Sequence, residues 1–200
     1  MTIIKNFTLL IFMVVFLDGC AVTNIQEDYL LDENKGTGLL IISLTRSGIS
    51  ESSMFADIRG VDNKYDDSIP VTDLFASSDW GCPLFGDIPE NQTCGRLAIV
   101  ELPKGEYEFY AWHGNSGSTS AWSVKKFSKR FIITPGKAVY AGNINFFLKK
   151  EYTGETMFGI KVPTPTFYVT TSDTRERDLS LFYKKNPKIT SDDVQIHIIK

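Results

Sequence analysis

Two short turns that contain proline and glycine constrain this chain more than any other feature. Pro103-Lys104-Gly105 separates LAIVEL from EYEFYAWH, and Pro135-Gly136-Lys137 separates FSKRFIIT from AVYAGNINFFL. The flanking segments are continuously apolar or alternate apolar with polar residues, which is typical of β-strands. Because proline fixes φ and glycine accepts unusual φ values, both triplets favour tight turns. The sequence therefore predicts two strand pairs, 97–102 with 106–113 and 127–134 with 138–148.

Further strand-like segments surround these pairs. The run Leu39–Thr45 is rich in aliphatic and β-branched residues, which predicts a strand that is buried on both faces or lies in a sandwich core. Gly142 marks a β-bulge, and Pro163 and Pro165 confine their region to a sheet edge. The remaining predicted strands are 54–58, 158–162, 167–171 and a final strand at 194–200. This spacing predicts a mainly β fold, an antiparallel β-sandwich of Ig-like or transthyretin-like type, with a partly open barrel as the alternative.

One helix is expected just before the last strand. Ser172 or Asp173 is the predicted N-cap, and Glu176 is placed for a capping box. Acidic residues lie near the start and lysines near the end, as the helix dipole favours. Asn186-Pro187 stops the helix.

The stretch from Gly60 to Gly95 lacks sustained periodicity and holds three of the eight prolines, so it predicts a long loop. Cys82 and Cys94 lie in this stretch, and a disulfide between them is the simplest account in an oxidising compartment. The loop that it closes corresponds to about 3 kcal/mol of stabilisation. The alternative, a redox or metal site, lacks a Cys-x-x-Cys pair.

The first twenty residues have the layout of an export signal. Lys5 precedes an apolar run from Phe7 to Leu17, too short to span a bilayer comfortably. The ending Leu17-Asp18-Gly19-Cys20 resembles the lipobox of bacterial lipoproteins, although Asp18 stands where a small or mildly apolar residue is usual. The resemblance implies a signal peptide at 1–19 and lipid on Cys20. After the signal peptide we expect a flexible polar tether at 20–37 and one domain at 38–200.

Two segments carry a second resemblance. VELPKGEYEFYAW and FIITPGKAVYAGNINF are similar to bacterial lipoproteins of unknown function that contain a transthyretin-like or carboxypeptidase-regulatory-like β-sandwich. The likeness covers 97–147 and consists of turn motifs. It implies a surface-tethered sandwich and no activity. By resemblance to Gram-negative sorting, Ala21 after the cysteine implies the outer membrane, with the domain facing the periplasm or the cell surface.

Composition and motifs exclude several functions. The formal net charge of −3 argues against nucleic-acid binding, which needs a basic surface. Asp62, Asp66 and Asp67 lack the glycine and terminal glutamate of a calcium loop, and no motif indicates a metal or other cofactor. His113 precedes the loop GNSGSTSAW, so it could act as the base for a serine nucleophile at Ser116, Ser118 or Ser120. However, the sequence has no Gly-x-Ser-x-Gly nucleophile elbow.

The aromatic residues near His113 indicate a surface instead. Tyr110 and Trp112 share the alternation of Glu106 and Glu108, the polar face of their strand, so we expect a binding patch of Tyr110, Trp112, His113 and Trp122. We expect a lipid-anchored envelope protein, a non-catalytic module that binds another envelope protein or a glycan through sheet edges and the loops 60–95 and 113–122. The alternatives are an envelope hydrolase that uses His113 with a nearby serine, and a structural spacer.

Overall fold

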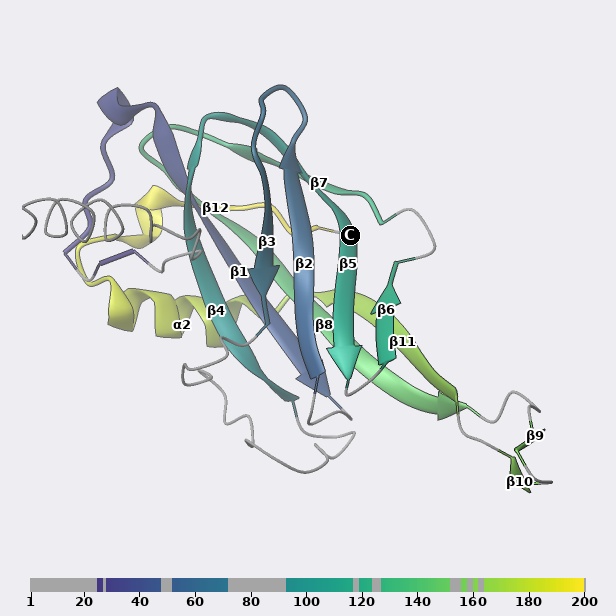
Figure 1. The fold of residues 1–200 in the computed structure, drawn as a ribbon. Coiled ribbons are helices and arrows are strands. Elements are labelled where there is room, and N and C mark those ends of the chain that lie inside the picture. Colours follow the sequence, from purple (N-terminus) through teal and green to yellow (C-terminus); the bar gives the residue numbers. More distant parts are fainter. Residues whose placement is uncertain are drawn as a thin grey trace, which may run out of the picture.

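The protein is mainly β, with one α-helix in the part of the chain that the computed structural model describes, residues 25–26, 28–47, 52–71, 93–116, 119–123, 127–151, 156–157, 160–161 and 164–199 (Figure 1). Sheet A contains β1 (Thr37–Ser47), β4 (Thr93–Pro103), β8 (Ala138–Glu151), β11 (Thr164–Ser172) and β12 (Val194–Ile196). Sheet B contains β2 (Ser52–Gly60), β3 (Asp66–Pro70), β5 (Gly105–Ser116), β6 (Thr119–Trp122) and β7 (Lys129–Ile133). The short strands β9 (Thr156–Met157) and β10 (Ile160–Lys161) pair with each other.

Sheet A is mixed rather than antiparallel. Its order is β11-β8-β1-β4, and β8 runs parallel to both β1 and β12. Sheet B, in the order β3-β2-β5-β6 with β7 beside β5, is antiparallel. The prediction of antiparallel pairing throughout was therefore wrong for sheet A. Two other details were confirmed: the β1–β8 register shifts next to Gly142, and β11, which contains Pro165, is an edge strand.

Both proline–glycine turns connect the two sheets instead of closing hairpins. β4 pairs with β1 in sheet A, whereas β5 belongs to sheet B, and the turn after β7 likewise leads from sheet B to β8 in sheet A. The strands were predicted correctly, but their pairing was wrong. Two-residue hairpins use type I′ or II′ turns, and a proline with fixed negative φ favours types I and II, which splay the strands. Gly136 adopts φ 68°, which only glycine accepts easily.

The two sheets share one buried core. It contains apolar residues from the inward faces of β1, β2, β4, β5, β7 and β8, among them Leu40, Ile58, Val100, Phe109 and Ile144. On β1 the alternate residues Leu39 and Ile41 are also buried, in a second cluster on the other face of sheet A. The prediction that β1 is buried on both faces is confirmed. Burial of each large aliphatic side chain contributes roughly 1.5–3 kcal/mol.

The helix α2 (Arg175–Lys185) covers the second face of sheet A. Phe182 is fully buried there against residues of β1, β4 and β8, and Ile189 beyond the helix joins them. The helix ends at Lys185 with Asn186 as its C-cap, so Asn186-Pro187 stops it as predicted. It begins later than predicted, because Ser172 still belongs to β11 and the N-cap is Thr174, and Glu176 makes no capping box. The layers are therefore α2, sheet A and sheet B, in that order.

Three N-terminal side chains also belong to this helix-side cluster. Ile25, Tyr29 and Leu31 are partly buried against it, just before the 3-10 helix η1 (Glu33–Lys35). This portion of the expected tether therefore lies against the domain. The predicted signal peptide, Cys20 and Cys82 lie outside the described residues. Among the helices that are described, none is long and apolar enough to cross a membrane.

The expected loop between residues 60 and 95 contains a strand that the sequence prediction missed. β3 pairs with β2 at the edge of sheet B. Its sequence DDSIP is polar because most of its side chains face solvent or the outer side of the sheet, and only Ile69 is fully buried. A single apolar residue gives no alternation to detect. The second 3-10 helix, η2 (Ser191–Asp193), leads into β12, which confirms the predicted final strand in shorter form.

Candidate functional site

The outer face of sheet B is the surface that no described helix covers (Figure 1). We call it the open face. It consists of the side chains that point away from the shared core on adjacent strands: Phe55, Asp57, Arg59, Asp66, Ser68, Glu108, Tyr110, His113 and Trp122. The exposed indole of Trp122 and partly exposed aromatic rings among charged side chains distinguish this face from a purely solvated sheet surface.

A row of contacts centred on His113 crosses four strands of the open face. The Nδ1 atom of His113 lies 3.0 Å from the Asp57 carboxylate, and Ser68 donates its hydroxyl proton to the same carboxylate at 2.7 Å. Phe55 stacks on the imidazole, with ring centroids 4.7 Å apart and planes inclined by 10°. On the other side, Trp122 is the cross-strand partner of His113, and 66% of its surface is exposed. Because Nδ1 faces this carboxylate, the second ring nitrogen, Nε2, is the one that a ligand would meet.

A second row on the same face involves Tyr110. The guanidinium of Arg59 lies 4.6 Å from the centre of the Tyr110 ring and donates to Glu108 at 2.8 Å. Tyr110 donates its hydroxyl proton to Asp66 at 3.2 Å. The hydrogen bond from Ser128 and then the Arg59 contact lower the pKa of Glu108, whereas burial raises the pKa of Tyr110. These groups satisfy one another, so this row stiffens the face beside His113.

Trp112 does not belong to the open face, contrary to prediction. It packs against the shared core, edge to face with Phe146 at 6.3 Å. The reason is a β-bulge in β5. Asp57 pairs with Ala111 and Ile58 with Phe109, so no residue of β2 lies opposite Tyr110 in the backbone pairing. One extra residue reverses the alternation of all later side chains. Of the four predicted patch residues, the open face brings together Tyr110, His113 and Trp122.

The region predicted as a loop at 113–122 is largely a hairpin. β5 continues to Ser116, and β6 pairs with it from Thr119 to Trp122. Ser120 lies opposite Asn115 in that pairing and is exposed, while Ser118 lies outside the described residues. The serine that does join the row, Ser68, donates to Asp57 and not to the imidazole. Asp57 was missed at first, although a lone acid within the apolar segment 54–58 is a usable signal.

A buried polar cluster lies under the start of α2. Asp178 is fully buried, and its carboxylate accepts hydrogen bonds from the hydroxyls of Ser43, Tyr140 and Thr174, each at 2.7 Å. Arg177 donates to the other carboxylate oxygen at 2.8 Å. This cluster was missed, although a serine within the aliphatic strand β1 was a signal for it. Its members bond to one another, so it fixes the helix on sheet A.

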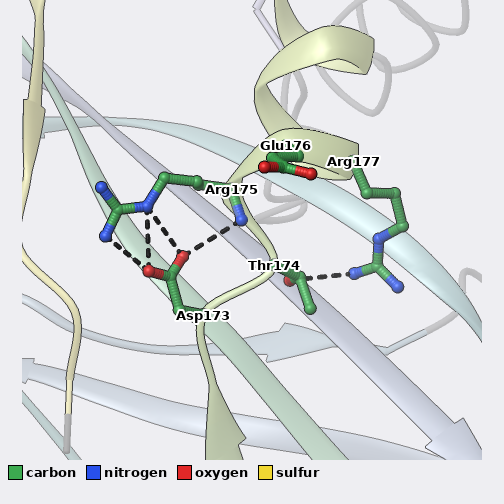
Figure 2. A pocket seen from close by; sticks show the side chains of 5 residues that line it. All are labelled: Asp173, Thr174, Arg175, Glu176 and Arg177. Carbon is green, nitrogen blue, oxygen red and sulfur yellow. Dashed lines mark hydrogen bonds and ion pairs between the residues drawn. The ribbon is translucent and has the colours of Figure 1, made fainter.

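An open hollow of about 390 Å³ adjoins this cluster, lined by residues 173–177. Figure 2 shows that its two arginines point to opposite sides. Arg175 donates to Asp173 through Nε at 2.9 Å, which lowers the pKa of that carboxyl, and Arg177 donates to Thr174 at 3.2 Å. Because internal partners already neutralise both guanidinium groups, the hollow offers less to an anion than its two arginines suggest.

The other predicted residues are distributed apart. Asp62 accepts from the backbone of Glu106, Asp66 from Tyr110, and Asp67 from Tyr65. Within the described part of the chain, no three histidine, cysteine or acidic residues gather in a way that could hold a metal ion. Cys94 is buried on the inward side of β4, and Arg46 donates to its sulfur at 3.4 Å. Since Cys82 lies outside the described residues, the disulfide stays a prediction.

Comparison with protein-family models and with curated proteins gave no match. Among solved structures, a leucine-rich repeat protein from Bacteroides thetaiotaomicron is similar over 54% of this chain, with 15% identity and a TM-score of 0.31. This chain spans 13% of the length of that protein. A likeness this weak carries no conclusion about fold or function.

The open face combines two chemical capacities. The exposed indole of Trp122 offers a flat apolar surface, while His113, Asp57 and Ser68 supply hydrogen-bonding groups that are already oriented by one another. A few fixed polar groups beside an aromatic surface are what small polar ligands need for affinity and orientation. Rigid strands carry all of these groups, so binding requires little ordering of the protein.

Proposed function

We propose that this protein is a lipid-anchored component of the bacterial cell envelope whose open face binds an envelope glycan. The anchor is assigned to Cys20 and the location to the outer membrane, on the grounds of the lipobox and Ala21. The domain acts as a binding module and not as an enzyme. The observation that carries the binding proposal is the exposed Trp122 next to the His113–Asp57 pair.

A glycan suits this surface better than a protein partner does. Sugar rings have an apolar face that packs on an exposed indole and hydroxyls that need fixed donors and acceptors. Trp122 and the Asp57–His113–Ser68 contacts provide both within adjacent strands. A stable protein interface needs about 800 Å² on each partner with a desolvated apolar centre. Near His113, charged residues surround the aromatic ones, which favours the smaller polar ligand.

The binding proposal is tested by measuring the affinity of the purified domain for envelope polysaccharides and their fragments. Trp122→Ala removes the stacking surface, and His113→Phe keeps the stack on Phe55 but removes the nitrogen atoms. We expect each variant to weaken binding by about tenfold or more, or ~1.4 kcal/mol. Ile132→Ala, another exposed apolar residue of sheet B, is the matched control. Equal affinity in all four proteins, or no glycan binding at all, would refute the glycan proposal. Capture of an envelope protein that depends on Trp122 would replace it with the protein alternative.

The anchor is tested by metabolic labelling with a fatty-acid analogue. We expect label on the wild-type protein and none on Cys20→Ser. Asp18→Ala restores a more usual lipobox and should increase the processed fraction, which makes it the matched variant for the one position that departs from the pattern. If the wild-type protein stays unlabelled, the anchor and the outer-membrane assignment both fail.

A hydrolase is the second candidate because His113 has the carboxylate partner that a general base requires. Asp57 would orient the imidazole and stabilise its protonated form, as in catalytic triads. The nucleophile would come from the serines near the β5–β6 turn. Assay of the wild-type protein and His113→Ala on broad hydrolase substrates separates the two candidates. An activity that His113→Ala abolishes would displace the binding module.

We also propose that the two sheets form a β-sandwich related to transthyretin-like domains. The support is the core shared by both sheets and the two turns on which the family resemblance depends. An experimental structure in which the parallel β1–β8 pairing and α2 match a different fold would overturn this relationship.

A further inference from the structure

The packed N-terminal segment bears on how the protein sits at its membrane. Ile25, Tyr29 and Leu31 lie against the helix-side cluster, and burial, followed by a hydrogen bond with Glu101, raises the pKa of Tyr29 to about 12. Lys188 donates to the backbone oxygen of Asp28 at 3.5 Å, which ties the segment to the chain just beyond α2. Ile25, the first residue that the structure describes, thus lies on the helix side of sheet A.

The distance from this point to the anchor is limited by covalent geometry. Five residue steps separate Ile25 from Cys20, and an extended chain spans at most about 3.6 Å per residue, or about 18 Å in total. Stacked sheets lie about 10 Å apart, and a helix adds a layer of similar thickness, so the open face is about 20 Å away through the molecule. A lipid on Cys20 therefore reaches a bilayer on the helix side and does not reach one on the open face without running around the whole stack.

The helix side also exposes side chains that suit a lipid interface. Leu30 is 59% exposed within the packed segment, although its neighbours are partly buried. Lys184 and Lys188 are exposed near the end of α2, and long lysine side chains keep their charge at headgroup level. Carboxylates such as Glu33 and Asp192 are exposed as well, so the inference depends on the length of the link and not on charge.

We propose that the surface formed by Leu30, Lys184 and Lys188 rests on the membrane that holds the lipid of Cys20, and that the open face points away from it. This inference rests on the proposed anchor. It makes the open face available to a ligand at some distance from the bilayer, about the thickness of the domain. It also assigns the packed segment a role, since a free tether of the same length would allow many orientations.

Photolabelling in vesicles tests the orientation. Lipidated full-length protein is bound to phosphatidylcholine vesicles that contain a phospholipid with a photoreactive headgroup, and labelled peptides are identified by mass spectrometry. We expect label on the peptides that contain Leu30 and Lys188 and little or none on those that contain Trp122 and Ile132, which both lie on the outer side of sheet B. Label concentrated on the open face, or spread evenly over both sides, would overturn the inference.

A lengthened link provides the control variant. About twenty glycine and serine residues inserted between Ala21 and Val22 add roughly 25 Å of mean reach and leave the packed segment intact. We expect this variant to lose the preference for the helix side, whereas the same spacer added after Lys200 should leave it unchanged. An unchanged preference in the lengthened variant would refute the dependence on link length. Intact mass reports the lipid separately, so a protein without lipid identifies failure of the anchor itself.

Discussion

Replacing Asp178 with alanine should destabilise the domain strongly, although the residue lies far from the open face. Its carboxylate is fully buried and accepts hydrogen bonds from three hydroxyls and from Arg177. Removing one partner of a buried charged group costs about 3–5 kcal/mol. Here the lower end applies, because 34% of the Arg177 side chain is exposed and can be hydrated, and the Ser43 hydroxyl can donate instead to the Asn143 side-chain oxygen 2.9 Å away. We therefore expect about 3 kcal/mol.

The assay is urea denaturation followed by circular dichroism, with the slope of the transition checked for constancy. A loss of about 3 kcal/mol corresponds to a fall in Tm of roughly 6–12 °C for a domain of this size. Glu176→Ala removes the same charge from the exposed side of the same turn and should stay within about 0.5 kcal/mol of wild type. Tyr140→Phe, alone and combined with Asp178→Ala, measures their coupling. Equal stability of Asp178→Ala and Glu176→Ala would refute the reasoning.

Three further predictions concern pH and backbone conformation. Because the folded state raises the pKa of Tyr29 from 10 to about 12, the contribution of Tyr29 to stability is complete below pH 10 and is lost as pH rises toward 12. Hydrogen exchange of residues 25–31 should report this loss, and Tyr29→Phe should abolish it. Glu108 has a lowered pKa, so its contribution is present above about pH 4.3 and is lost as pH falls through the folded pKa. Acid titration of Glu108→Gln should show a shallower decline. Gly36 and Gly136 share φ 68°, but a Cβ at Gly36 meets nothing, whereas one at Gly136 meets Glu33 at 3.0 Å. Gly36→Ala should cost about 1–2 kcal/mol and Gly136→Ala clearly more in urea denaturation. Equal costs would exclude the contact as the cause.

Individual strands and the end of the helix could be predicted from local sequence. Leu39–Thr45 is apolar on both alternations, so β1 had to be buried on both sides, and Asn186-Pro187 cannot continue a helix. Strand partners could not be predicted in the same way. After Pro103 the chain can return beside β4 or cross to the other sheet. The outcome depends on how the two sheets pack, and a local sequence pattern does not contain that information.

The candidate site was also only partly predictable, because its single residues stand out locally but their contacts depend on strand pairing. His113 and Trp122 stood out as polar and aromatic residues around a β-turn region, and both lie on the open face. The prediction put Trp112 on the wrong face because the β-bulge at Tyr110 contains neither glycine nor proline, the residues that would indicate a bulge in the sequence. The partnership of Asp57 with His113 joins β2 to β5 across a long stretch of chain, and only the sheet register brings them together.

The two turns that cross between the sheets also determine when the domain can form. Because they direct successive strands into different sheets, β1 receives its neighbours late: Leu40 pairs with Val100 on one side and with Val139 on the other. Contacts so distant in sequence predict that sheet A forms slowly. A nascent chain released before β8 is complete would carry the apolar strand β1 with an unpaired edge, which is a template for aggregation. We expect the first strand of this domain to depend on a chaperone until β8 has emerged.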